Sequence, residues 1–254
     1  MTASKPNSLK LISLNIEMWK HLDIVIPFLI REAPDVVCIQ ELLEDDISKF
    51  ENALGGLAHF APRQKFITPN GLQVIGIALL SRLPAVEIYQ KYYVGGENHI
   101  VAYDTTSEKT RHETESCAVL FGTFEKDGTE FKIGTTHFTW CPDGMATDFQ
   151  REDMRKLLDI LQSFGELILT GDFNAPRGGE IFSMLADKYK DNIPEQYMTS
   201  IDGNLHRAGQ LNLMVDGLFS TPEYEVSNVQ MIRGVSDHCA LLAIVSKKGI
   251  GKDV

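Results

Sequence analysis

The sequence lacks an excess of basic residues. Among 254 residues, 24 Lys and Arg stand against 35 Asp and Glu, which gives a formal net charge of −11. This acidic balance opposes the many phosphate contacts that binding along a nucleic-acid duplex requires. The composition therefore argues against broad duplex binding, but it is compatible with a local basic strip on the surface.

Paired cysteines are also missing. The four cysteines are Cys38, Cys117, Cys141 and Cys239, and no two of them form a C-x-x-C pair. Three of them lie within apolar runs typical of strands, where a cysteine packs as a small hydrophobic side chain. We therefore predict neither a zinc site nor a disulfide framework.

No apolar run approaches the roughly 18 residues that a membrane-spanning helix needs. The polar start of the chain lacks the apolar segment of a secretory signal. We expect a cytoplasmic protein without membrane insertion that acts as a monomer. The domain is predicted over residues 9–246, with a flexible N-terminus over 1–8 and a polar tail over 247–254.

Apolar spacing predicts a chain of mixed helices and strands. Pro27 indicates that the first helix starts near Ile24 or kinks. The polar segment 104–114 is predicted to be an exposed loop near the site, and Thr147 with Gln150 has the pattern of a capping box. The predicted helices cover residues 22–32, 43–54, 147–164 and 181–186, and the predicted strands 10–14, 35–39, 72–80, 86–94, 117–124, 130–135, 167–169, 213–219, 226–232 and 239–245.

One short stretch concentrates polar chemistry. The apolar run 167–169 predicts a buried strand that stops at Gly171. Asp172 and Asn174 follow one residue apart, and in an extended backbone this spacing points both side chains the same way. An ordinary Asx-type turn is the alternative interpretation, because Asp, Asn and Gly all favour it.

Other polar residues also stand at the ends of apolar strands, where a rigid scaffold commonly positions a site. Their carboxylate and amide oxygens suit a hard cation such as Mg²⁺ or Mn²⁺ better than zinc. The whole set is Asn15, Glu41, His137, Asp172, Asn174, Asp216, Asp237 and His238.

Six short motifs occur along the chain in the order Leu14-Asn15, Pro34 to Glu41, Thr136-His137-Phe138, Gly171 to Asn174, Val215 to Phe219 and Ser236-Asp237-His238. In their residues and their order they resemble the motifs of the endonuclease/exonuclease/phosphatase superfamily, and the resemblance covers about residues 9–245. It implies an α/β fold of two packed mixed β-sheets flanked by helices, a four-layer αββα sandwich. It also implies metal-dependent cleavage of a phosphate ester.

The resemblance implies a metal site and a catalytic group. Glu41 is the expected principal ligand of Mg²⁺ or Mn²⁺, helped by Asn15, with Asp237 at or near the metal. Asp172 is expected to orient or deprotonate the attacking water, and Asn174 to bond the phosphate.

Two histidines complete the implied set. His137 is expected to donate to a non-bridging oxygen, and His238 to act as a base or to stabilise the pentacovalent phosphorus. Asp216 would fix the tautomer of His238. Gly217 stands where the family more often has a bulkier residue, so a turn residue is the alternative interpretation of Asp216.

The substrate is predicted to be a phosphodiester of single-stranded or terminal nucleic acid, as in a nuclease or a DNA-repair enzyme. Trp19 and Trp140 can stack on a base or pack as core aromatics. Arg111 can bind a phosphate bidentately or be solvated. The alternatives are a hydrolase of a small phosphoester, such as a phospholipid headgroup or inositol phosphate, and a non-catalytic binding module of the same fold.

Overall fold

Two six-stranded β-sheets pack against each other in the computed structural model, which describes residues 7–248 without the side chain of Asp143. The first sheet contains, in spatial order, β11 (Tyr224–Ile232), β12 (Ala240–Lys247), β1 (Ser8–Asn15), β2 (Val36–Leu43), β4 (Gly71–Ser81) and β3 (Leu57–Thr68). The second contains β5 (Ala85–Val94), β6 (Cys117–Lys126), β7 (Thr129–His137), β8 (Ile168–Asp172), β10 (Asp216–Ser220) and β9 (Lys190–Asp191).

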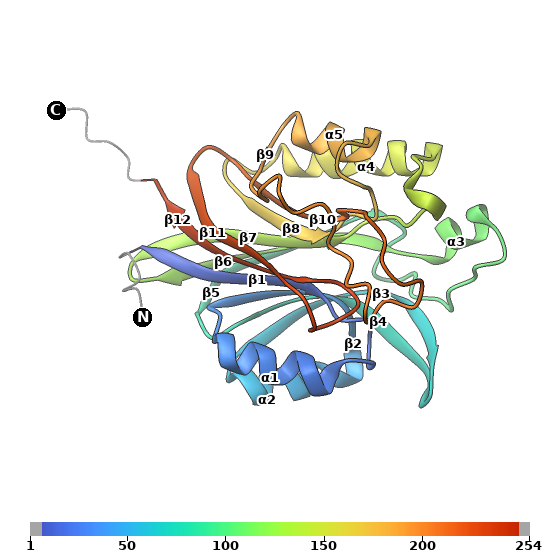
Figure 1. Cartoon of the computed structure of the whole chain (residues 1–254), viewed down its shortest axis with the longest axis horizontal. Helices are drawn as coiled ribbons and strands as arrows, with labels where there is room; N and C mark the ends of the chain where they lie inside the picture. The colour runs from blue at the N-terminus through green and yellow to red at the C-terminus, as the bar shows by residue number, and fades with distance from the viewer. Residues whose placement is uncertain (1–6, 249–254) are drawn as a thin grey trace.

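Helices cover the outer faces of both sheets (Figure 1). Helices α1 (Leu22–Glu32) and α2 (Ile47–Leu54) lie against the first sheet. Helices α4 (Asp148–Leu161) and α5 (Glu180–Ala186) lie against the second. The predicted αββα sandwich of mixed sheets is therefore confirmed. No helix within residues 7–248 has both the length and the apolar character needed to cross a membrane.

Apolar side chains fill the space between the layers. Leu11 and Cys38 of the first sheet pack with Ile133 and Ile168 of the second in the central core. The strands at this interface are buried on both faces, which is why they appear in the sequence as continuous apolar runs. All four cysteines are buried.

The pairing of the strands brings polar residues to one edge of the sandwich. Strands β1 and β2 run parallel, as do β7 and β8, so their C-terminal ends lie together in each sheet. Strand β10 is antiparallel to β8 and begins at Asp216, directly opposite Asp172. Strand β12 is antiparallel to β1, so the segment before it reaches the same edge.

Several local expectations were wrong. Helix α1 begins at Leu22 and continues through Pro27, so a start near Ile24 is excluded. Within the predicted loop 104–114, the structure forms helix α3 (Glu108–Thr114), because Ser107 and Thr110 make a reciprocal capping box. At Thr147 only half of the predicted box forms, since the Gln150 side chain donates instead to the Thr139 carbonyl at 2.7 Å.

The ends of other elements also shift. The predicted strand 213–219 starts only at Asp216, and Lys247 belongs to β12, where its ammonium pairs with Glu166. Strand β3 was not predicted as an element, because its burial pattern does not alternate. The predicted flexible N-terminus and polar tail lie largely outside the described residues.

Gly171 allows β7 and β8 to approach closely at the site. Its φ is +143°, and a Cβ atom at this position would lie 2.0 Å from the carbonyl oxygen of Thr136. Only glycine adopts this conformation at little cost, and no flexible side chain is available to move away. The glycine therefore sets the distance between the two strands that end in His137 and Asp172.

We predict that Gly171→Ala lowers the free energy of unfolding by at least about 2 kcal/mol, because backbone strain and a backbone clash add together. Urea denaturation measures the loss. Gly165→Ala is the matched control, since a Cβ there meets no atom within 4 Å, and it should change stability by less than about 0.5 kcal/mol. Equal effects of the two substitutions would contradict this account.

Candidate active site

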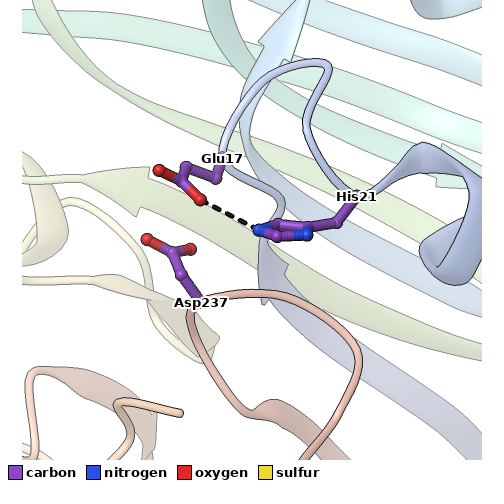
Figure 2. Close-up of side chains that lie close together, drawn as sticks. All are labelled: Glu17, His21 and Asp237. Atoms are coloured by element: carbon purple, nitrogen blue, oxygen red, sulfur yellow. Dashed lines mark hydrogen bonds and ion pairs between the residues drawn. The ribbon is translucent and has the colours of Figure 1, made fainter. Parts of the chain in front are cut away.

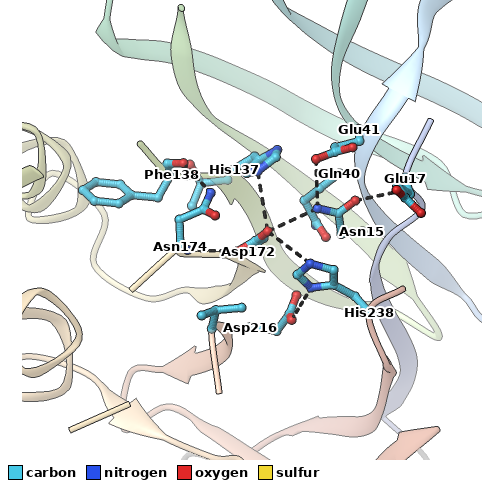
Figure 3. A network of polar contacts seen from close by, with 12 residues as sticks. Asn15, Glu17, Gln40, Glu41, His137, Phe138, Asp172, Asn174, Asp216 and His238 are labelled. Atoms are coloured by element: carbon cyan, nitrogen blue, oxygen red, sulfur yellow. Dashed lines mark hydrogen bonds and ion pairs between the residues drawn. The ribbon is translucent and has the colours of Figure 1, made fainter. Parts of the chain in front are cut away.

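A cavity of about 500 Å³ opens at the polar edge of the sandwich. Figure 3 shows the side chains that converge beside it from both sheets. Asp216 lies behind the cavity wall and contacts it through His238. Seven of the eight predicted catalytic and metal-binding residues line the cavity, namely Asn15, Glu41, His137, Asp172, Asn174, Asp237 and His238.

Asp172 is at the centre of this group and is 2% exposed. Its Oδ2 accepts a hydrogen bond from Asn15 Nδ2 at 3.2 Å and lies 3.5 Å from His137 Nε2 and 3.7 Å from His238 Nε2. Burial raises the pKa of Asp172 to about 6, although the positive charge of His238 opposes this shift. A carboxylate with such a pKa can exchange a proton near neutral pH.

His238 lies between two carboxylates. Its Nδ1 is 2.7 Å from Asp216 Oδ2, and its Nε2 faces Asp172. Burial alone would lower the pKa of His238, but the charges of Asp216 and Asp172 raise it well above its ordinary value. His238 is therefore held as an imidazolium with a fixed orientation.

Asp216 is the first residue of β10, so the turn interpretation is wrong. The absence of a side chain at Gly217 has a steric reason. A Cβ there would lie 2.6 Å from ring atoms of both Phe173 and Phe219. These aromatic rings occupy the space that a bulkier residue after Asp216 would need.

His137 is 6% exposed and differs from His238 in charge. Burial, followed by the positive charge of Arg63, lowers its pKa well below the ordinary value. Its Nδ1 is buried without a hydrogen-bond partner among the described residues. His137 is therefore a neutral imidazole that can donate through Nε2.

Asn174 lies in an Asx turn and also contributes its side chain to the site, so both interpretations of this stretch apply to it. Its backbone N–H donates to Asp172 Oδ1 at 2.8 Å in an Asx turn, and its φ of +49° excludes the extended backbone that we predicted. Its side chain nevertheless lines the cavity. One N–H of the amide donates to the Phe138 carbonyl at 2.9 Å, which leaves the second N–H for a substrate.

Glu41 reaches the cavity through an irregular strand. It lies where the register of β2 against β4 shifts between Ile39 and Leu42, and its φ is +60°. A bulge of this kind redirects a side chain. Burial and the negative charge of Asp237 raise the pKa of Glu41 to about 7, and Asn15 Nδ2 donates to Glu41 Oε1 at 3.3 Å.

A second acidic group adjoins Glu41. Ligand atoms of Glu17, His21 and Asp237 all lie within 4.8 Å of one another (Figure 2). His21 Nε2 is 2.9 Å from Glu17 Oε2, and Lys20 also pairs with Glu17. Glu17 and His21 were not among the site residues predicted from the sequence. Glu17 follows Asn15 by two residues, and this spacing at a strand end was an available signal.

The donor chemistry fits a divalent cation. Carboxylates of Glu17, Glu41 and Asp237 line the cavity, and burial raises the pKa of Asp237 as well as that of Glu41. Carboxylates packed this closely repel one another unless a cation neutralises them. Oxygen ligands of this type suit Mg²⁺ or Mn²⁺.

Two of the three predicted substrate-binding residues lie at the cavity, and the third does not. Arg111 and Trp140 both line the cavity, with the guanidinium 5.0 Å from the centre of the indole ring. Trp19 is not among the lining residues and packs with Met18, Leu43 and Ile75 instead.

Further lining residues carry no motif in the sequence. Arg63 pairs with Glu115 at 2.7 Å, and both side chains are buried. The two residues are 52 positions apart, so no local spacing could indicate the pair. Tyr103, His206 and Arg207 reach the cavity from loops.

Solved structures with the same fold come from distant organisms. The chain matches an endonuclease/exonuclease/phosphatase from Beutenbergia cavernae with a TM-score of 0.73 at 16% identity, covering 96% of this chain and 72% of that one. It matches the human Nocturnin catalytic domain, solved with a bound sulfate anion, with a TM-score of 0.67 at 18% identity, covering 95% and 94%.

A third similar structure is a mannosyl-6-phosphatase from Bacteroides thetaiotaomicron, with a TM-score of 0.66 at 15% identity and coverage of 93% and 99%. No curated protein sequence matches the chain significantly. The sequence model of the Endonuclease/Exonuclease/phosphatase family matches residues 12–238, which is most of the chain. The chain therefore belongs to this family and is a phosphoric ester hydrolase.

Proposed function

We propose that this chain uses Mg²⁺ or Mn²⁺ to hydrolyse a phosphodiester at a single-stranded or terminal position of a nucleic acid. The observation that supports this best is the presence of two unlike groups in one cavity. A cluster of carboxylates around Glu41 adjoins a buried carboxylate, Asp172, that faces two histidines. In-line hydrolysis of a phosphate ester needs both charge neutralisation and a positioned water.

Glu41 and Asp237, with Asn15, would hold the cation, and Glu17 adjoins Asp237. When bound, the cation supplies positive charge to the phosphate oxygens and lowers the cost of developing negative charge. Asn15 links the two groups, because its amide donates to Glu41 and to Asp172.

The remaining side chains act on water and phosphate. Asp172 orients the attacking water and accepts its proton, which a pKa of about 6 permits near neutral pH. His238 donates through Nε2 to a negatively charged oxygen on the pentacovalent phosphorus, while Asp216 fixes its ring. His137 donates to a non-bridging oxygen, and the second N–H of Asn174 bonds the phosphate.

The cavity favours a flexible or terminal substrate. Its volume of about 500 Å³ suits a nucleotide-sized group, whereas a duplex needs a long open track. Trp140 is 43% exposed beside the catalytic group and offers an aromatic surface for a base. The net charge of −11 gives no support for a long duplex contact.

A small phosphoester is the second candidate. The cavity can hold a sugar phosphate as well as a nucleotide, and a similar fold occurs in the mannosyl-6-phosphatase of Bacteroides thetaiotaomicron. A panel of oligonucleotides, sugar phosphates, inositol phosphates and headgroup diesters, each with and without chelator, tests both. Cleavage of only the small esters would exclude the nucleic acid. Chelator-resistant cleavage would exclude the metal, and no cleavage of any ester would favour a binding module.

We predict that Glu41→Gln lowers turnover at least about a hundredfold, because the substitution keeps the shape but removes the charge that holds the cation. The rise in melting temperature on adding Mg²⁺ or Mn²⁺ should also disappear. Glu44→Gln removes a nearby exposed carboxylate and is the matched control. Full activity of Glu41→Gln at ordinary Mg²⁺ would remove Glu41 from the metal site.

The pair of His238 and Asp216 should behave as one unit. Asp216→Asn is expected to cost most of the activity that His238→Ala costs, and the double variant should be little worse than either single variant. Turnover of the four proteins in a double-mutant cycle measures the coupling. Additive losses would show that Asp216 does not act through His238.

Stacking on Trp140 should distinguish substrates. Trp140→Ala is expected to reduce kcat/KM about tenfold or more on an oligonucleotide, since base stacking contributes about 1–3 kcal/mol. A small chromogenic phosphodiester without a base should be cleaved as before. Similar losses on both substrates would make Trp140 a packing residue, and Trp19→Phe provides the control outside the cavity.

A further inference from the structure

One wall of the cavity carries an arginine that has no part in the chemistry described above. Arg111, on helix α3, lies over the indole of Trp140, and both side chains line the cavity. The Nε of Arg111 is buried and has no hydrogen-bond partner among the described residues. A buried donor without an acceptor is costly, so hydrogen bonds within the described residues do not account for the position of this guanidinium.

The charge of Arg111 is also uncompensated. Arg63, Arg151 and Arg177 pair with carboxylates at 2.7 or 2.8 Å. Arg111 forms no ion pair within residues 7–248, although the chain carries an excess of acidic residues. A guanidinium left without a carboxylate in such a chain, and facing a cavity, is suited to an anion from outside.

A buried carboxylate holds this wall in place. Asp153 of α4 is fully buried, and its Oδ2 accepts from His112 Nε2 at 2.9 Å and from Thr139 Oγ1 at 2.7 Å. His112 directly follows Arg111, and Thr139 directly precedes Trp140. One carboxylate oxygen therefore fixes the segments that carry both members of the stacked pair.

Helix α3 depends on this link. It has seven residues and no buried side chain, and a helix this short is unstable without tertiary contacts. The ring of His112 also stacks on Phe149 at 4.2 Å between centroids. The hydrogen bond to Asp153 raises the pKa of His112, because the buried carboxylate favours the protonated ring.

We propose that Arg111, stacked on Trp140, binds a second phosphate of the substrate next to the scissile ester, and that Asp153 is its positioning residue. This rests on the proposed function and narrows its substrate class to esters with a neighbouring phosphate. The planar guanidinium offers two parallel N–H donors to a phosphate, and the indole holds that plane.

Two chromogenic probes test the subsite. Thymidine 5′-(4-nitrophenyl phosphate) is compared with the same compound carrying a 3′-phosphate, so that the base, sugar and leaving group are shared. In the wild type the 3′-phosphate should lower KM. Arg111→Gln should raise KM about tenfold to a hundredfold for the 3′-phosphorylated probe alone, with kcat unchanged.

Arg155→Gln removes the same charge from an exposed position of α4 and is the matched control. A rise in KM for both probes with Arg111→Gln would overturn the second-phosphate assignment. Arg207 also lines the cavity. If the decrease in KM caused by the 3′-phosphate disappears in Arg207→Gln but not in Arg111→Gln, the assignment of Arg111 is overturned as well.

The positioning role of Asp153 has its own readout. Asp153→Asn should raise KM for the 3′-phosphorylated probe with little change in kcat, and it should add little to Arg111→Gln. Asp159→Asn changes an exposed carboxylate of the same helix and is the control. A loss of kcat on both probes, in protein that circular dichroism shows to be folded, would contradict a role through Arg111.

Binding without turnover separates the subsite from the reaction. In a Trp19→Phe background Trp140 is the only tryptophan, so its fluorescence reports binding of thymidine 3′,5′-bisphosphate against thymidine 5′-monophosphate. If the bisphosphate binds more tightly than the monophosphate, and Arg111→Gln abolishes this difference, the subsite is supported. Failure to hydrolyse either probe would then contradict only the proposed reaction. Equal binding of the two nucleotides, with hydrolysis intact, overturns the subsite alone.

Discussion

The buried carboxylate of Asp172 is the constraint on which the site depends. A buried charge without partners costs several kcal/mol, so its oxygens must meet donors or cations. These come from both sheets, with Asn15 from β1, His137 from β7 and His238 from the segment before β12. Stabilising this charge and assembling the site therefore require the same alignment of the two sheets.

Backbone strain gathers around the same carboxylate. Glu41 and Asn174 adopt positive φ without being glycine, and Gly171 has a φ that other residues rarely adopt. Each of these conformations directs a polar side chain into the cavity or brings two strands together there. Such strain persists only where the surrounding packing holds it, and these three instances lie at the candidate active site.

Much of the fold could be predicted, because strands buried on both faces appear as apolar runs and the polar residues at their ends identify one edge of the sandwich. Helix α3 escaped prediction since it has no apolar face. Asn174 was given the right location but the wrong backbone, because the turn at Asp172 reverses the chain locally. The pair of Arg63 and Glu115 joins distant segments, which spacing along one sequence does not encode.

The burial of the cysteines has a practical consequence for chemical labelling. All four are enclosed, and burial raises the pKa of Cys38 and of Cys239 to about 12, so these thiols carry almost no reactive thiolate at neutral pH. Thr105, by contrast, is exposed at the mouth of the cavity. A cysteine placed at Thr105 would be the one thiol open to a maleimide, and a fluorophore attached there would report events inside the cavity without any native cysteine being removed.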